Sequence, residues 1–148
     1  MPNRFQATVA LPVVMVIDDQ TANVQVVGQL LTQAEYDVVP VLDGREALAL
    51  AERSPPDLVL LDMRMPGFDG FQVLEGLQTM PQTRDVPVLF LTADHERASL
   101  TRAFSAGAVD YITKPFLAEE MLARVRMHLD LKQARDRLAR VADERQKV

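Results

Sequence analysis

The 148-residue chain contains no cysteine, which excludes disulfides, thiolate metal sites and cysteine nucleophiles. It also has no long hydrophobic run. Its longest apolar stretches, such as Val86–Leu91, are far shorter than the roughly 20 residues that span a bilayer. A secretory signal is not expected at residues 1–12 either, because this segment contains Arg4 but no long apolar region. We therefore expect a cytoplasmic protein without membrane contact, in which residues 1–12 form a loosely held arm.

The composition is that of a globular domain, with 48% hydrophobic and 25% charged residues, and it excludes disordered and fibrous classes. The length is sufficient for one domain with a sizeable core. The net charge of −5 is unevenly distributed, because residues 129–148 carry six basic and four acidic side chains. Residues 1–128 therefore carry −7, and such an acidic body argues against nucleic-acid binding by this domain.

Short apolar runs alternate with longer amphipathic stretches, without an internal repeat. The runs contain mainly Val, Leu and Ile with little polar alternation, as strands buried on both faces do. One of them contains Pro40, which suits an edge strand because proline has no N–H for a ladder. The predicted strands are Val13–Ile17, Asp37–Leu42, Leu58–Leu61, Val86–Leu91 and Val109–Ile112.

Stretches with helical spacing lie between and after these runs. Asp43, with Glu46 three residues later, predicts a capping box at the start of the second helix. Gly107 is the expected C-cap of the fourth helix. The last helix begins near Leu117 and continues to the end of the chain without Gly or Pro. Its predicted core-facing stripe contains Leu117, Met121, Leu122, Val125 and Leu129.

Five strand–helix units in this order predict a parallel sheet covered by helices on both faces. The length suggests a flavodoxin-like, doubly wound α/β fold with strand order 2-1-3-4-5 and an extended C-terminal helix. We expect an arm at residues 1–12, a globular domain at 13–130 and a helical or coiled-coil extension at 131–148. In such sheets ligands bind beyond the carboxyl ends of the strands.

Polar residues follow these strands. Asp18 and Asp19 end the run "VMVIDD", Asp62 follows the third strand, Thr92 the fourth and Lys114 the fifth. Adjacent carboxylates at a strand end are costly unless a cation joins them, and three of them suit Mg²⁺. The simpler alternative is that Asp18 and Asp19 only cap the first helix.

Four segments, "VIDDQ", "LVLLDMRMPGFDGFQVL", "LFLTAD" and "DYITKPF", resemble the receiver domain of bacterial two-component response regulators. The resemblance covers about residues 13–130. It implies a protein that is not an enzyme, except in promoting its own phosphorylation and dephosphorylation. The implied donor is a phosphohistidine on a sensor histidine kinase or phosphotransfer protein.

The resemblance also implies a role for each matching residue. Asp62 resembles the phosphoacceptor, and Thr92 and Lys114 resemble the pair that holds the phosphoryl group. Tyr111 resembles a switch aromatic that turns inward when Thr92 moves, although plain core packing explains it equally well. The peptide bond between Lys114 and Pro115 is expected to be cis. The implied Mg²⁺ ligands are Asp18, Asp19, Asp62 and the backbone carbonyl of Arg64.

The regulated surface implied by this resemblance runs from about Glu96 to Arg126, over the fourth helix, fifth strand and fifth helix. Arg64 and Asp94 are predicted to pair across the mouth of the pocket and to obstruct the attacking water, which gives a long-lived phosphoryl state. His95 and His128 have no partner visible in the sequence, and we expect both at the surface or its boundary without a role.

The C-terminal extension carries Leu131, Ala134, Leu138 and Val141 at alternating spacings of three and four, which is an a/d seam. Its phase slips between Leu129 and Leu131, as at a stutter. The extension is therefore a parallel homodimer stalk, a connector to an output domain, or a solvated, frayed helix. No output domain follows Val148, and we interpret the chain as a fragment of a larger regulator.

Two other functions compete with a phosphorylation switch. One is a Mg²⁺-dependent phosphohydrolase with an aspartyl-phosphate intermediate on Asp62. Haloacid-dehalogenase enzymes would have a second carboxylate two residues later, where this chain has Arg64. The other is an interaction module that works without phosphorylation, although such a module need not retain the complete acceptor set.

Overall fold

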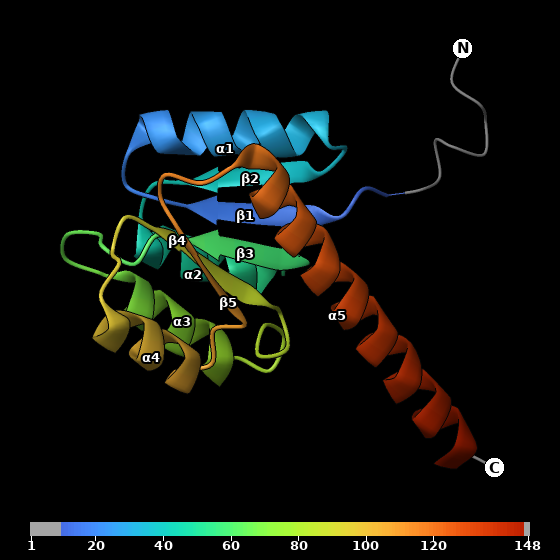
Figure 1. Cartoon of the computed structure of the whole chain (residues 1–148). Helices are drawn as coiled ribbons and strands as arrows, with labels where there is room; N and C mark the ends of the chain where they lie inside the picture. The colour runs from blue at the N-terminus through green and yellow to red at the C-terminus, as the bar shows by residue number, and fades with distance from the viewer. Residues whose placement is uncertain (1–9, 147–148) are drawn as a thin grey trace.

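The computed structural model describes residues 10–146. Most of the predicted N-terminal arm lies outside these residues. Strands and helices alternate along the chain (Figure 1). The elements are β1 (Val13–Ile17), α1 (Thr21–Gln33), β2 (Asp37–Val41), α2 (Gly44–Arg53), β3 (Leu58–Leu61), α3 (Gly70–Thr79), β4 (Val88–Thr92), α4 (Arg97–Ser105), β5 (Asp110–Thr113) and α5 (Ala118–Gln146).

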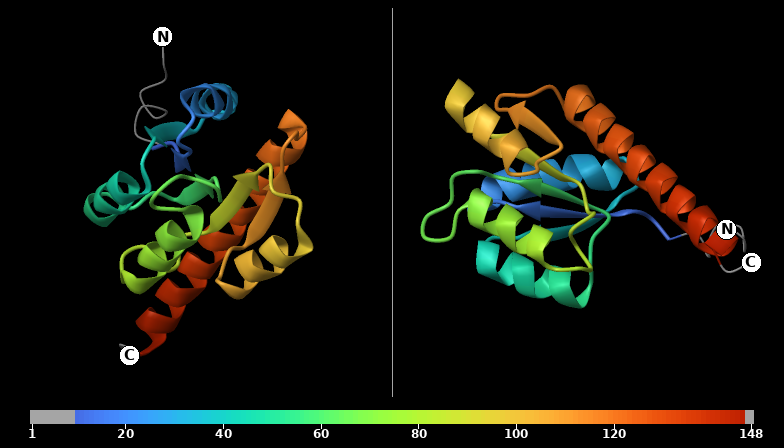
Figure 2. Two further views of the ribbon diagram at one scale, coloured as in Figure 1. Left: turned by 90° about the vertical axis from the view of Figure 1, so that its left-hand side faces the viewer. Right: turned by 90° about the horizontal axis from the view of Figure 1, so that it is seen from below.

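All strand pairs are parallel, and their order is β2-β1-β3-β4-β5, as predicted. Pro40 lies in β2, which is an edge strand, so its missing N–H interrupts no ladder inside the sheet. Figure 2 shows helices on both faces of the sheet. One hydrophobic core lies between the sheet and α1 with α5, and a second lies under α2, α3 and α4.

The two last strands begin later than the sequence suggests. Val86 belongs to a turn, where its N–H donates to the Thr83 carbonyl at 3.0 Å, so β4 begins at Val88. Thr92 is consequently the last residue of β4 and not the residue after it. Val109 precedes β5, which begins at Asp110.

The helix caps also differ in part from the prediction. Asp43 does cap α2, but it accepts from the Arg45 N–H, and Glu46 completes no capping box. The capping box is at α3, where Asp69 and Gln72 satisfy each other's backbone N–H groups at 3.0 and 2.9 Å. Gly107 lies one residue beyond the C-cap of α4, with a φ of +109° that favours glycine.

The stripe predicted for α5 is correct except at its first residue. Met121, Val125 and Leu129 are buried and Leu122 is partly buried in the core. Leu117 precedes the helix, and it is 68% exposed. It was assigned by spacing alone, and spacing does not show where the helix begins.

His128 contradicts the expectation of a surface or boundary position without a role. It is only 8% exposed, and its Nε2 lies 3.0 Å from Oδ2 of Asp110, the first residue of β5. Oδ1 of the same carboxylate accepts from Nη1 of Arg124 at 2.5 Å and from the Tyr111 N–H at 2.8 Å. Burial acts to raise the pKa of Asp110, but His128, Tyr111 and Arg124 together hold this pKa below its usual range. The ionised carboxylate therefore joins β5 to α5.

Within the described residues, no helix combines the length and hydrophobicity needed to cross a membrane.

We expect Asp110→Asn to lower the free energy of unfolding at pH 7 by about 2 kcal/mol, because it removes the charge that His128 and Arg124 contact. The lowered pKa contributes stability above the usual aspartate pKa and loses it as pH falls. The difference should therefore shrink below about pH 4. Denaturant unfolding measures it, with Asp85→Asn as control, because Asp85 is exposed. Equal stability of wild type and Asp110→Asn at pH 7 would contradict the prediction.

Candidate functional site

The carboxyl ends of β1, β3, β4 and β5 meet at one edge of the sheet. Backbone hydrogen bonds continue past the strand ends and fix the register of the residues there. The Asp62 N–H donates to the Ile17 carbonyl at 2.9 Å, and the Lys114 N–H donates to the Thr92 carbonyl at 2.8 Å. The ladder thus brings together side chains that are far apart in the sequence.

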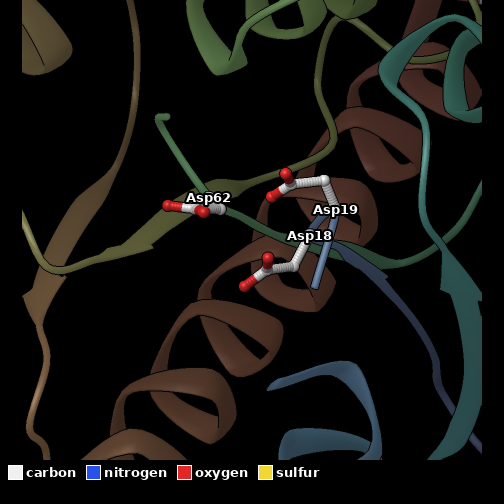
Figure 3. A group of neighbouring side chains, drawn as sticks. All are labelled: Asp18, Asp19 and Asp62. Carbon is white, nitrogen blue, oxygen red and sulfur yellow. The ribbon is translucent and has the colours of Figure 1, made fainter. Parts of the chain in front are cut away.

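Three carboxylates gather at this edge. Asp18 and Asp19 follow β1 and Asp62 follows β3 (Figure 3). One oxygen from each lies within 4.8 Å of the others. Asp18 is buried, Asp62 is half-buried and Asp19 is exposed. Hard oxygen donors with one open side are the set that Mg²⁺ prefers, since it usually keeps several waters, so these residues fit the ion.

Asp18 is the most heavily contacted of the three carboxylates. Its Oδ1 accepts from the Gln20 N–H at 3.0 Å, and its Oδ2 accepts from Nδ2 of Asn23 at 3.2 Å and from Nζ of Lys114 at 3.0 Å. The N-cap of α1 is Gln20, so neither Asp18 nor Asp19 caps that helix. The helix-cap interpretation is therefore wrong, and Lys114 compensates part of the local negative charge.

The pKa of Asp62 is raised, first by burial and then by the negative charge of Asp18, while Lys114 acts in the opposite direction. The contact between the Arg64 N–H and Oδ1 of Asp62 is long, at 3.4 Å. Ionised Asp62 is therefore poorly compensated by the protein itself. A bound cation would relieve this repulsion.

Thr92, at the end of β4, and Lys114, directly after β5, lie at the same edge as Asp62. Thr92 is buried, and the peptide bond between Lys114 and Pro115 is cis, as expected. Asp62, Thr92 and Lys114 line an open cavity of about 480 Å³. The other lining residues are Gln20, Asn23, Arg64, Ala93, Asp94, His95 and Glu96.

Arg64 and Asp94 pair across this cavity, as predicted. Nη2 and Nε of Arg64 donate to Oδ2 of Asp94 at 2.6 and 3.2 Å. Asp94 also accepts from the Glu96 N–H and from the Ser99 hydroxyl, both at 2.8 Å. The Glu96 N–H, then Arg64 and Ser99, lower the pKa of Asp94 to about 2. The Asp94 side chain is 4% exposed and that of Arg64 is 69% exposed, so the guanidinium covers the carboxylate.

Tyr111 is buried, and its hydroxyl donates to the Asp94 backbone carbonyl at 2.6 Å. Burial, reinforced by Asp94, raises its pKa to about 12. We expected the ring to turn inward only after phosphorylation, but this structure already holds it inside. The Asp94 carbonyl provides the acceptor that makes this position favourable.

Four contact residues at the site were not predicted. They are Gln20, Asn23, Glu96 and Ser99. Gln20 and Asn23 lie at the start of α1, and Glu96 and Ser99 lie at the start of α4. These helices follow β1 and β4, whose ends carry predicted site residues. A polar side chain or an unpaired backbone N–H at such a helix start is the feature of the sequence that could have identified them. His95 is exposed at the rim of the cavity.

Comparisons with known proteins agree with this geometry. Residues 14–126 match the response regulator receiver domain. The chain is 45% identical over 116 residues to the DNA-binding dual master transcriptional regulator RpaA of Synechocystis, and 42% identical over 113 residues to the response regulator PleD of Caulobacter vibrioides. These alignments cover 78% and 76% of this chain, but only 48% and 25% of the two relatives.

A solved structure gives the same result. It is the receiver domain of sensor histidine kinase PA1611 from Pseudomonas aeruginosa, with a magnesium ion coordinated in the active-site cleft. The TM-score is 0.76 at 29% identity, over 82% of this chain and 99% of that one. With this fold, this acidic edge and these matches, the chain belongs to the response regulator receiver domain family.

Proposed function

We propose that this domain accepts a phosphoryl group on Asp62 from a phosphohistidine. A carboxylate oxygen of Asp62 attacks the phosphorus, the bond between phosphorus and the histidine nitrogen breaks, and the nitrogen keeps the electron pair. The observation that carries this proposal is the half-buried Asp62 beside Asp18, Asp19 and Lys114 in a receiver fold.

The surrounding residues have distinct roles in this proposal. Asp18, Asp19, Asp62 and the backbone carbonyl of Arg64 would hold Mg²⁺. The ion would neutralise charge on the carboxylates and on the phosphoryl oxygens. The Thr92 hydroxyl and the Lys114 ammonium donate to the transferred group. Phosphoryl transfer depends mainly on such positioning and electrostatic stabilisation.

We propose that this domain is cytoplasmic, that its partner is a sensor histidine kinase or phosphotransfer protein, and that it turns over no small-molecule substrate. We also propose a homodimer that associates through residues 131–148. The chain spans about half or less of the length of the curated relatives named above. We therefore expect the output to come from a further domain or a separate partner.

The regulated surface is proposed to run from Glu96 to Arg126. Asp94 supports this, because it contacts Ser99 in the first turn of α4 and Tyr111 in β5. Since Tyr111 is already inside, we propose that phosphorylation holds the ring there by drawing Thr92 toward the phosphoryl group. The two states of the switch then differ in the lifetime of the Tyr111–Asp94 hydrogen bond, which is longer after phosphorylation.

Incubation with acetyl phosphate and Mg²⁺ should add about 80 Da to the chain, the mass of one phosphoryl group. Mass spectrometry should show no such species for Asp62→Ala, and chelation of Mg²⁺ should abolish it in the wild type. Turnover of phosphate monoesters without a stable phosphoprotein would instead favour the phosphohydrolase.

Asp62→Asn should raise the melting temperature at pH 7 in the absence of divalent cations. The raised pKa means that the folded state disfavours ionised Asp62. This penalty is full above the folded pKa and disappears below the usual aspartate pKa. The gain should therefore vanish near pH 4 and below.

Mg²⁺ should stabilise the wild type more than Asp62→Asn. Thermal unfolding with and without Mg²⁺ measures both effects. The exposed carboxylate of Asp85 offers a control, because Asp85→Asn removes one charge far from the cavity. A melting temperature of Asp62→Asn at or below the wild-type value at pH 7 without metal would refute the prediction.

Arg64→Asn should accelerate loss of the phosphoryl group severalfold, because the Arg64–Asp94 pair no longer obstructs the attacking water. Asp94→Ala should act in the same direction. The decay of the phosphorylated mass in buffer gives the rate, and the exposed Arg84→Asn is the matched control. An unchanged rate in Arg64→Asn would show that the pair does not limit water access.

A further inference from the structure

An exposed apolar stripe runs along α5, from the domain body to its far end. Met127, Leu131, Leu138 and Val141 are 48%, 51%, 70% and 45% exposed, and Ala134 lies between them on the same line. Successive members are four, three, four and three residues apart. This is the a/d pattern of a two-stranded coiled coil, with Leu131 and Leu138 at a positions. We call these five residues the α5 seam.

The α5 seam faces away from the core of its own domain. Met127 lies two residues from Val125 and two from Leu129, which are both buried in the core. Two residues correspond to about 200° around a helix of 3.6 residues per turn, so the seam and the core stripe occupy nearly opposite sides. There is consequently no stutter between Leu129 and Leu131, because these residues belong to different stripes.

The far end of α5 extends beyond the sheet and the other helices (Figure 1). Where the helix still lies on the domain, the seam borders a shallow groove of about 480 Å³. It is lined by Ala123, Arg126, Met127, Asp130 and Leu131. All five residues belong to α5, so a partner helix would contact α5 both where it lies on the domain and along its free part.

The charges beside the seam discriminate between possible partners. Asp130 occupies a g position and Arg135 the e position five residues later. Within residues 10–146, neither forms an ion pair in its own chain, whereas Lys132 and Asp136 on the outer side pair with each other at 2.8 Å. In a parallel, in-register pair of identical helices, g faces e of the second copy. Asp130 then faces Arg135 twice, once on each side.

Antiparallel pairs of the same helices match the seam less well, because an a position then faces a d position and no such alignment pairs all five seam residues. One alignment sets Leu131 against Val141 but leaves Met127 opposite Arg145, and it places Asp130 against Glu144, which carry like charges that oppose association. The other sets Met127 against Leu138 and Asp130 against Arg137, but leaves Val141 opposite Arg124. Only the parallel, in-register pair matches every seam residue and also pairs Asp130 with Arg135.

We propose that the α5 seam binds a second copy of this chain as a parallel, in-register coiled coil, with the two receiver domains on the outer sides. This proposal specifies the homodimer proposed above and rests on it, but it does not require phosphorylation of Asp62. The seam spans only about two heptads, so association depends on protein concentration. A second copy satisfies both the apolar stripe and the Asp130–Arg135 charge pattern.

Single cysteines test this geometry directly, because the chain has none of its own. Ala134→Cys and Val141→Cys occupy d positions with little change in volume. Mild oxidation with copper–phenanthroline should convert most of both variants to disulfide-linked dimers on non-reducing gels. Gln133→Cys, on the outer face, is the matched control and should remain largely monomeric. Both seam variants must cross-link more than Gln133→Cys. If one or both of them do not, the parallel register is wrong.

Sedimentation equilibrium of the whole chain provides a second measurement. Leu138→Glu should raise the dimer dissociation constant at least tenfold, whereas Gln133→Glu adds the same charge outside the seam and should change it little. Asp130→Arg and Arg135→Asp should each weaken the dimer, and the double variant should restore it. A wild-type chain that remains at 16.5 kDa at all concentrations would overturn the proposal.

Phosphorylation is measured separately, so the two proposals can fail independently. Leu138→Glu should still gain the phosphoryl mass on Asp62, and Asp62→Ala carrying Val141→Cys should still cross-link. Loss of cross-linking in that double variant would contradict association without phosphorylation. Loss of the mass gain in the wild type would refute only the phosphoacceptor role.

Discussion

The parallel sheet forces Asp18, Asp19 and Asp62 together, and their mutual repulsion is the constraint on which the rest of the site depends. The register of β1 and β3 places their backbones side by side, because the Asp62 N–H donates to the Ile17 carbonyl directly before Asp18. Lys114 compensates Asp18 at 3.0 Å, but the raised pKa of Asp62 shows that this is not enough. A divalent cation would neutralise the excess negative charge, and it would also allow an anionic phosphoryl group to bind beside the carboxylates. The repulsion among the carboxylates is thus the physical reason for expecting metal-dependent chemistry at this edge.

Asp94 connects this edge to the rest of the domain. Its side chain holds Arg64 and Ser99, and its backbone carbonyl accepts from Tyr111. Its N–H lies 3.3 Å from the Thr92 hydroxyl, so one residue contacts the β3–α3 loop, the end of β4, α4 and β5. If Thr92 turns toward a phosphoryl group, it must change its contact with the same residue that Tyr111 uses. Contacts alone do not establish coupling. Coupling requires an element with two discrete arrangements, and we propose that the Tyr111–Asp94 hydrogen bond is that element.

The sequence was sufficient for the strand order and for the convergence of the charged residues, because both follow from which residues end each apolar run. It was sufficient for the Arg64–Asp94 pair because both residues lie two positions beyond predicted site residues. Prediction from the sequence was wrong where the burial of a residue depends on a partner far away in the chain. His128 has no neighbour in the sequence that reveals its contact with Asp110, and the Asp69–Gln72 capping box at the start of α3 was not predicted. The prediction for Leu117 was wrong for a different reason. The spacing of the core-facing stripe is correct, but the stripe was continued to a residue that precedes the helix.

The two stripes of α5 explain how one helix serves both the domain and an assembly. Met121, Val125 and Leu129 fix it to the sheet, while the α5 seam on the opposite side remains available. Asp110 strengthens the attachment at the point where the helix leaves the domain, through His128 and Arg124. The same carboxylate accepts from the backbone N–H of Tyr111. A movement of β5 at Tyr111 would therefore reach α5 through the contacts of the buried Asp110 carboxylate, which are costly to break. It would rotate or tilt the seam as a rigid element, because a continuous helix transmits the motion of its first turns along its whole length.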